Sequence, residues 1–210
     1  MQIATYELPP VGTNAYLLLP PNRAEAVLVD APFGALKAIS PQLKKANRRL
    51  AAVLLTHGHW DHIASAAECQ AAGAAIYAHP DDREWIENPM MQADFMVPGL
   101  EIDPVRIDNF LQPRQILEIV GLSLEVRHVP GHAPGSVLFY DRVAKVAFVG
   151  DAIFAGSVGR TDLPGGDWEQ LENSIRTQIY TLPGDTVLYP GHGPATTVAA
   201  ERATNKFVRG

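Results

Sequence analysis

The sequence predicts an α/β fold, because short apolar segments of strand length alternate with helical segments and several predicted strands end in polar residues. The clearest strand is Ala51 to Leu55, an aliphatic run typical of a strand buried on both faces. His57-Gly58-His59-Trp60-Asp61-His62 follows it directly. An Ala-rich helix is expected from His62 to Gly73. The polar cluster would therefore lie between the carboxyl end of a strand and the amino end of a helix, where α/β proteins place their binding sites.

Composition and charge limit the classes of protein to which the chain can belong. The chain has 210 residues, 47% of them hydrophobic and 19% charged, so we expect one globular domain spanning residues 1–210. A formal net charge of −6 argues against nucleic acid as a partner. The first residues lack the pattern of a secretory signal, and no apolar run is long enough to cross a bilayer, so we expect a cytoplasmic protein without a membrane partner.

Three strands and one helix are expected before the central cluster. The predicted strands are Ile3 to Leu8, Ala15 to Leu19 and Ala26 to Val29, and the helix runs from Leu36 to Asn47 with an interruption at Pro41. Asp30 stands at the end of the third strand. Two interpretations of Asp30 carry equal weight: a turn residue that bonds nearby backbone amides, or a residue that supports a metal ligand.

The middle of the chain is less regular. A short strand, Ala75 to Ala78, leads into a short helix through Trp85 and Ile86, and His79 is interpreted as a loop or packing histidine. Residues 88–109 hold several methionines and prolines with weak periodicity. That pattern is equally consistent with a lid over a substrate pocket and with the plain packing of a long loop.

The second half of the chain predicts more strands and two helices. The expected strands are Ile116 to Val120, Leu122 to Val129, Ser136 to Tyr140, Val143 to Val149 and Thr186 to Tyr189; the helices are Trp168 to Ile179 and Thr197 to Phe207.

A short motif occurs twice in this half: a strand residue, then Pro-Gly-His, then a proline two positions later. It ends in His132 and in His192. We expect the proline to end the strand, the glycine to permit a positive φ, and the histidine to be held on a stiff turn. Both histidines are therefore candidate ligands. His128 is predicted to face the other side of its strand from Val129, as a core or surface histidine.

Seven residues with metal-binding side chains collect at predicted strand ends: His57, His59, Asp61, His62, His132, Asp151 and His192. Imidazole and carboxylate ligands without thiolate suit zinc, iron or manganese. Seven ligands are too many for one tetrahedral site, so two metal sites that share a bridging carboxylate are expected. Within the central cluster, His57 and His59 can project to one side of an extended backbone, while Asp61 and His62 would face a different point.

The motif His57-Gly58-His59-Trp60-Asp61-His62, together with the later His, Asp and His, resembles the metallo-β-lactamase superfamily over nearly the whole chain. The resemblance implies a four-layer αβ/βα sandwich of two mixed β-sheets flanked by helices, with the metals at one edge of the sheets. It also implies the role of each ligand. The first metal would be held by His57, His59 and His132, the second by Asp61, His62 and His192, and Asp151 would bridge them.

Within that superfamily, the segments Gly150 to Asp162 and Pro190 to Thr197 look like the glyoxalase II-like hydrolases, particularly their short bacterial members. β-Lactamases have Cys or Ser where Asp151 stands. The resemblance implies two divalent metal ions, zinc first among them, that lower the pKa of a bound water so that hydroxide attacks a small thioester such as S-lactoylglutathione. Asp61 is expected to be chiefly a ligand that could also orient the nucleophile. Arg160 and Asp162 are expected to pair and hold their loop.

Other functions are weighed against this hydrolase. A persulfide dioxygenase of the same superfamily, with one iron held by two His and an Asp, resembles the chain around the same segments. Hydrolysis of another small ester or a lactone is a further alternative. An RNA phosphodiesterase is disfavoured by the acidic balance, and a binding module without enzymatic activity is disfavoured because the set of ligands is complete.

Overall fold

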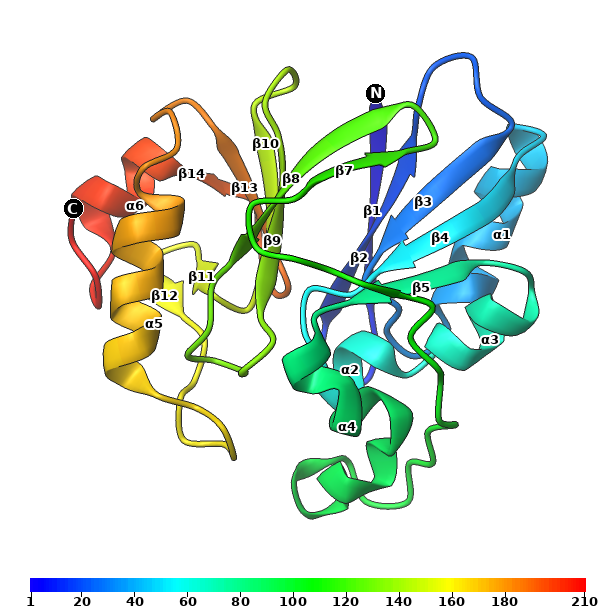
Figure 1. Cartoon of the computed structure of the whole chain (residues 1–210), viewed down its shortest axis with the longest axis horizontal. Coiled ribbons are helices and arrows are strands. Elements are labelled where there is room, and N and C mark those ends of the chain that lie inside the picture. The colour runs from blue at the N-terminus through cyan, green and yellow to red at the C-terminus, as the bar shows by residue number, and fades with distance from the viewer.

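The computed structural model describes residues 1–210 and contains two six-stranded mixed β-sheets that face each other (Figure 1). The first sheet has the strand order β1 (Gln2–Leu8), β2 (Thr13–Leu19), β3 (Glu25–Val29), β4 (Arg49–Leu54), β5 (Ala75–Ala78) and β6 (Asn109–Phe110). Strands β1 to β3 pair antiparallel, whereas β3 to β6 pair parallel. The parallel strands β3, β4 and β5 therefore end at the same edge of the sheet.

The second sheet has the order β14 (Thr196–Thr197), β13 (Val187–Pro190), β10 (Val146–Gly150), β9 (Val137–Asp141), β8 (Leu122–His128) and β7 (Ile116–Ile119). Only β10 and β13 pair parallel in this sheet. A small hairpin of β11 (Ile153–Phe154) and β12 (Ser157–Val158) follows β10. The sequence predicted all the longer strands and missed β6, β11, β12 and β14, which have two residues each and thus no measurable periodicity.

The helices cover the outer faces of the two sheets (Figure 1). Helices α1 (Ala35–Lys45) and α3 (Ala66–Ala71) pack on the first sheet, and α5 (Trp168–Ser174), the π-helical turn η3 (Ile175–Ile179) and α6 (Val198–Thr204) pack on the second. Four short elements lie near the edge where the ligands gather: the helices α2 (Trp60–Ile63) and α4 (Arg83–Glu87) and the 3₁₀ segments η1 (Pro80–Asp82) and η2 (Pro89–Phe95).

The alternation of side chains along β3 shows how the layers are built. Ala26 and Leu28 belong to the core between the first sheet and its helices. Val27 and Val29 belong to the core between the two sheets, together with Phe139 of the second sheet. A strand with both faces buried needs apolar residues at every position, which explains its uninterrupted aliphatic sequence. The four-layer α/β fold with two mixed sheets is confirmed.

The single helix predicted from His62 to Gly73 is wrong in its extent. The structure has two short helices there, α2 and α3, separated at Ser65. At that break the Ser65 backbone N–H donates to Ala31 O, and its hydroxyl accepts from Gly34 N. The break therefore ties the helical layer to the loop after β3, a contact that helix propensity cannot reveal.

Two smaller expectations fail for local reasons. Pro41 lies inside α1 without ending it, because the helix buries Ile39 and Leu43 against the sheet on either side of the proline. Val143 is 95% exposed in a turn and not in a strand. The Asp141 carboxylate accepts from Val143 N and Ala144 N and so shapes this turn.

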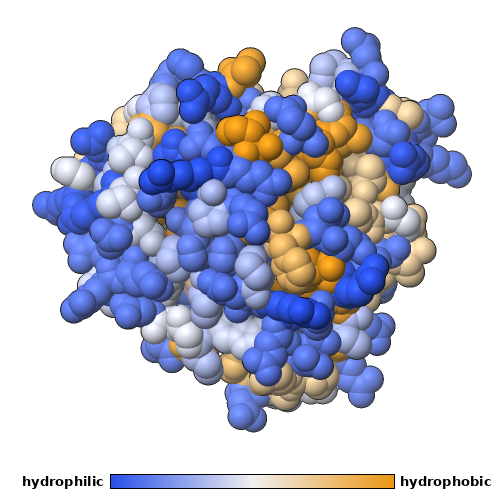
Figure 2. All heavy atoms as spheres, in the orientation of Figure 1, coloured by the Kyte–Doolittle hydropathy of each residue, from blue (hydrophilic) through white to orange (hydrophobic).

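On the face drawn in Figure 2, hydrophilic side chains cover most of the surface, and hydrophobic atoms gather over β7 and the neighbouring strands of the first sheet. Ile116 of β7 is 53% exposed there. None of the helices combines the length and the apolar character that crossing a bilayer requires.

Candidate metal centre

All seven predicted ligands come together at one edge of the sandwich. The loop after β4 and the first turn of α2 carry four of them; His132 follows β8, Asp151 follows β10, and His192 follows β13. Six of the seven residues are at most 8% exposed, and the side chain of His192 is 28% exposed. As the sequence predicted, the ligand-type residues stand at the ends of strands from both sheets.

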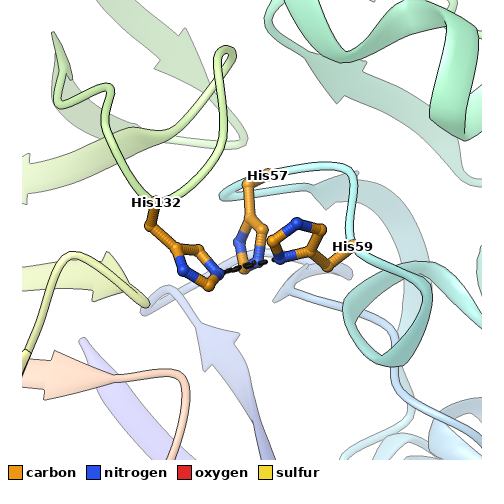
Figure 3. A group of neighbouring side chains, drawn as sticks. All are labelled: His57, His59 and His132. Carbon is orange, nitrogen blue, oxygen red and sulfur yellow. Dashed lines mark hydrogen bonds between the residues drawn. The ribbon is translucent and has the colours of Figure 1, made fainter. Parts of the chain in front are cut away.

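Three imidazoles form a first group (Figure 3). His132 Nε2 lies 3.2 Å from His57 Nε2 and 2.8 Å from His59 Nδ1, so the three ring nitrogens point toward one another. The ligands of a tetrahedral zinc ion, at about 2.0–2.1 Å from the metal, lie roughly 3.3 Å apart. The spacing of these nitrogens is therefore close to what one metal ion requires.

A second group lies beside the first and consists of Asp61, His62 and His192. Asp61 Oδ2 lies 3.2 Å from His192 Nε2 and 3.4 Å from His62 Nε2. Asp61 and His62 lie in the first turn of α2, whereas His57 and His59 precede that helix. The prediction of two points served by one loop thus agrees with the geometry.

Asp151 lies between the two groups. Its Oδ2 is 3.5 Å from His132 Nε2 and 3.4 Å from His192 Nε2, while its Oδ1 is 3.3 Å from His62 Nε2. Asp151 Oδ1 and His62 Nε2 are both buried without a hydrogen-bond partner. Buried polar atoms are nearly always paired, so these two orphaned atoms fit a site that receives a cation.

The imidazoles are held by partners on their other ring nitrogens. The Nδ1 contacts are His57 to Thr56 Oγ1 at 3.1 Å, His62 to Asp30 Oδ2 at 2.8 Å and His132 to Arg160 O at 2.7 Å. Such contacts orient the ring and determine which nitrogen is free to bind a metal. In each of these three residues the nitrogen left free is Nε2, which faces the other ligands.

Of the two interpretations of Asp30, the structure agrees with the residue that supports a metal ligand, and the amide that its side chain bonds lies not in its own turn but in the turn after β4. Its Oδ1 accepts from Thr56 N at 2.8 Å, and its Oδ2 accepts from Thr56 Oγ1 at 2.8 Å, which stabilises the turn after β4. The same Oδ2 holds His62 Nδ1. One buried carboxylate therefore links the start of the ligand loop to a residue of the second group.

Two supporting residues that the sequence did not reveal, Thr13 and Asn14, lie at the start of β2. The Thr13 hydroxyl donates to Asp61 Oδ2 at 2.7 Å. The Asn14 side-chain amide donates to Pro190 O at 3.0 Å and to Gly193 O at 2.9 Å, on either side of His192. The only signal in the sequence was a pair of polar residues that opens an otherwise aliphatic strand and that the structure shows to be buried.

The second copy of the Pro-Gly-His motif differs from the expectation. Gly131 has a φ of +127°, as predicted. Gly191 does not have a positive φ, so that expectation is wrong for this glycine. A Cβ on Gly191 would overlap Asp151 Oδ1 and lie 2.6 Å from His62 Cε1. Glycine is needed here because the backbone passes directly against the ligands.

His79 and His128 lie outside the two groups and stack on each other, with ring centroids 4.3 Å apart and an interplanar angle of 11°. The lone pairs of an imidazole lie in its ring plane, so two parallel rings cannot direct them at one ion. Although Asp81 lies nearby, the geometry agrees with the interpretation of both histidines as packing residues.

A cavity of about 290 Å³ opens onto the centre. It is lined by five of the seven ligand-type residues and by the apolar side chains of Val11, Phe95 and Leu163. Phe95 belongs to the segment 88–109, where Met96 and Ile102 pack against Trp60. Both interpretations of this segment therefore hold in part: it packs, and it also forms a wall of the cavity.

Arg160 and Asp162 form the predicted pair, with Nε to Oδ1 at 2.6 Å and Nη2 to Oδ2 at 2.8 Å. This loop also carries the backbone carbonyl that holds His132. Arg160 is also one of the residues that line the cavity.

Two facing mixed sheets with helices outside, with a group of three histidines and a His/Asp group at one edge, define a metallohydrolase scaffold suited to divalent metal ions. The chain belongs to the metallo-beta-lactamase superfamily, which it matches over residues 8–192.

Proteins with similar sequences carry names of the same class. The chain is 34% identical to the "Probable metallo-hydrolase YqgX" of Bacillus subtilis (strain 168), over 96% of this chain and 94% of that protein. It is 37% identical to the "Hydroxyacylglutathione hydrolase GloC" of Haemophilus influenzae, over 89% of each chain. These similarities support a metallo-hydrolase.

Solved structures show the same fold with different names. BLEG-1 B3 metallo-beta-lactamase has a TM-score of 0.91 at 37% identity over 100% of both chains. TTHA1623 in a di-iron-bound form has a TM-score of 0.85 at 35% identity, over 98% of this chain and 100% of that one. ETHE1 from Myxococcus xanthus has a TM-score of 0.77 at 25% identity, over 98% of this chain and 84% of that one. The substrate therefore has to be argued from the site.

The charges around the two groups predict that they bind metal with different pH dependence. Burial lowers the pKa of His192, but its contacts with Asp151 and Asp61 outweigh this and raise it to about 10. Burial likewise lowers the pKa of His62, and the neighbouring carboxylates raise it well above its usual value. Burial lowers the pKa of His59 to about 3. At pH 7 the second group therefore carries protons that a metal must displace, whereas the first group is neutral.

We expect the metal that enters the second group to release roughly one to two protons at pH 7, and the first metal to release almost none. The affinity of the second group for metal should accordingly rise with pH up to about pH 10. Titration calorimetry in buffers of different ionisation enthalpy measures the protons released by each metal. Equal proton release for both metals, or a second affinity that does not change with pH, would contradict the assigned charges.

Proposed function

We propose that the chain is a dinuclear metal-dependent hydrolase that cleaves a small thioester of the S-lactoylglutathione type. The position of Asp151 supports this most strongly. Its two oxygens face the first group through His132 and the second group through His62 and His192. A carboxylate between two complete ligand sets suits a bridge between two ions. Zinc is proposed for both, with iron as the alternative.

The two ions, when bound, would supply an activated water and a Lewis acid for the carbonyl oxygen of the substrate. Side chains that would hold the ions are themselves oriented: the Thr13 hydroxyl orients the Asp61 carboxylate, and Asp30 orients the imidazole of His62. The cavity beside them is at the small end of ligand sites. It suits the acyl group and the thioester, while the remainder of a glutathione-sized substrate would lie outside.

A thioester is the bond that this site is best equipped to cleave. In the reaction the water oxygen bonds to the acyl carbon and the C–S bond breaks. One water proton ends on the sulfur of the leaving thiol, and the carboxylic acid product releases the other to solvent. A thiol has a pKa of about 8.5, so thiolate leaves without a strong general acid. No carboxylate other than the ligand-type Asp61 and Asp151 lines the cavity. The likeness to a protein named hydroxyacylglutathione hydrolase supports the same proposal.

A specific observation favours a second candidate, a persulfide dioxygenase with one iron. His57, His62 and Asp151 also form a compact group of two histidines and one carboxylate. That ligand set is typical of non-haem iron(II) oxygenases. A single iron held by these three residues would leave four of the seven candidate ligands without a ligand role: His59, Asp61, His132 and His192.

One assay separates the two candidates. Purified protein loaded with zinc should release thiol from S-lactoylglutathione, lose this activity on treatment with a chelator, and regain it on addition of metal. The oxygen ester and the lactone of the same acid should react more slowly, because alkoxide is a poorer leaving group than thiolate. Oxygen uptake on glutathione persulfide by iron-loaded protein, without thiol release from the thioester, would overturn the proposal.

A further inference from the structure

Gly58, the residue between His57 and His59, is held by side chains on both of its backbone groups. Its N–H donates to Asp82 Oδ2 at 2.7 Å, and its carbonyl accepts from Gln92 Nε2 at 2.9 Å. A loop outside any strand thus has its backbone polar groups satisfied by two buried side chains.

Gln92 continues along the same loop. Its Oε1 accepts from Trp60 N at 2.9 Å, so the one amide bonds the carbonyl before His59 and the N–H after it. Gln92 is fully buried. The Gln92 side chain therefore pairs with the loop as the backbone of a neighbouring strand would. These two hydrogen bonds restrict the backbone conformation on both sides of His59.

Asp82 joins this loop to a second one. Its other oxygen, Oδ1, accepts from Gly135 N at 2.6 Å, three residues after His132. A Cβ on Gly58 would lie 2.9 Å from Asp82 Cβ, and a Cβ on Gly135 would lie 2.6 Å from Asp82 Cγ. The two glycines therefore allow one carboxylate to approach both loops, and those loops carry all three imidazoles of the first group.

This carboxylate is costly to bury. Asp82 is 2% exposed, and burial raises its pKa to about 6 even though Gly135 N and Gly58 N oppose that rise. A buried carboxylate whose partners are two backbone N–H groups adds little to packing that an apolar side chain could not provide. What only the carboxylate provides is a pair of acceptors that fix the distance between the two loops.

We infer that Asp82 and Gln92 are positioning residues of the metal centre, which align His57 and His59 with His132. We refer to the two residues as the loop clamp. The three imidazoles touch one another only through two ring-nitrogen contacts, 2.8 Å and 3.2 Å long, at the nitrogens that a metal would occupy. The loop clamp assembles their backbones beforehand, so metal binding does not have to order the loops.

The test uses two substitutions in the loop clamp and two matched controls. Asp82→Asn keeps the size of the side chain and one acceptor but turns an NH₂ group toward a backbone N–H. Gln92→Met keeps the length and removes both hydrogen bonds. As controls, Asp141→Asn changes a buried carboxylate that accepts from two backbone N–H groups at the far end of β9, and Gln70→Met removes an amide that donates to Arg106 O.

The readout is cobalt(II) binding, by chelator competition and by the visible spectrum of the bound ion, on variants whose folding is checked by thermal unfolding. We expect each loop-clamp variant to weaken the first metal about 10- to 100-fold and to change the cobalt spectrum. Both controls should keep the affinity within about twofold and the spectrum of the parent protein, whatever their thermal stability.

If Asp82→Asn does not fold, Gln92→Met decides the question. Parental affinity and spectrum in a folded loop-clamp variant would overturn the inference, and so would an equal loss of affinity in the controls. No substrate is needed, so the result does not depend on which bond the enzyme cleaves.

Discussion

Replacing Asp151 with alanine is expected to lower the hydrolytic activity by roughly 10²- to 10³-fold or more, because the substitution removes the one side chain that faces both ligand groups. Burial raises the pKa of Asp151, but the nearby histidines, His62 first among them, outweigh this and hold it well below its usual value. Its charge is therefore present throughout the working pH range. The variant should bind metal less tightly than the parent protein and should still fold, since the core clusters do not include this residue.

The comparison is with Asp162→Ala, which removes an exposed carboxylate from the loop that also carries Arg160. This control should keep most of the thioesterase activity and both metals. Activity and metal content are measured on the same preparations, together with circular dichroism. His132→Ala should resemble Asp151→Ala in activity. Full turnover in either ligand variant would show that the roles are assigned wrongly.

Gly191→Ala is the second substitution with a large expected effect, although it adds only one methyl group. The added Cβ would overlap Asp151 Oδ1. The backbone has little room to yield, because Gly191 N donates to Gly150 O at 2.8 Å and Gly191 O accepts from Asn14 N at 2.7 Å. The carboxylate must therefore move, and we expect a loss of about 10²-fold in activity with weaker binding of the second metal.

Gly184→Ala provides the matched control, since its Cβ would meet only Ala199 Cβ at 3.4 Å and its φ is not positive. Overpacking at Gly191 should cost about 1–3 kcal/mol of folding free energy, so thermal unfolding is measured alongside metal content. If Gly191→Ala kept both metals and full activity, the close approach of backbone and carboxylate would have no functional importance.

The sequence could place the seven candidate ligands at one edge of the fold because each one follows a segment with the composition of a strand. The run Ala51 to Leu55 predicts a buried strand, and the residues after it must then lie at the sheet edge. The repeated Pro-Gly-His segments mark two further strand ends in the same way. Local patterns of this kind depend only on neighbours in sequence.

The sequence could not predict the contacts between residues far apart in the chain. Thr13 reaches Asp61 across 48 positions, and Asp82 reaches Gly135 across 53. The break at Ser65 depends on Ala31 in the same manner. The sequence around Gly191 matches that around Gly131, which predicted a positive φ at both glycines. At Gly191, however, glycine is required because a side chain would overlap Asp151.

Anomalous diffraction from crystals grown with zinc, recorded on both sides of the zinc absorption edge, tests the dinuclear assignment most directly. The predicted result is two peaks roughly 3.5–4 Å apart. One peak should lie among His57, His59 and His132, and the other among Asp61, His62 and His192, with Asp151 between them. A single peak at full zinc loading, or peaks away from these side chains, would contradict the account.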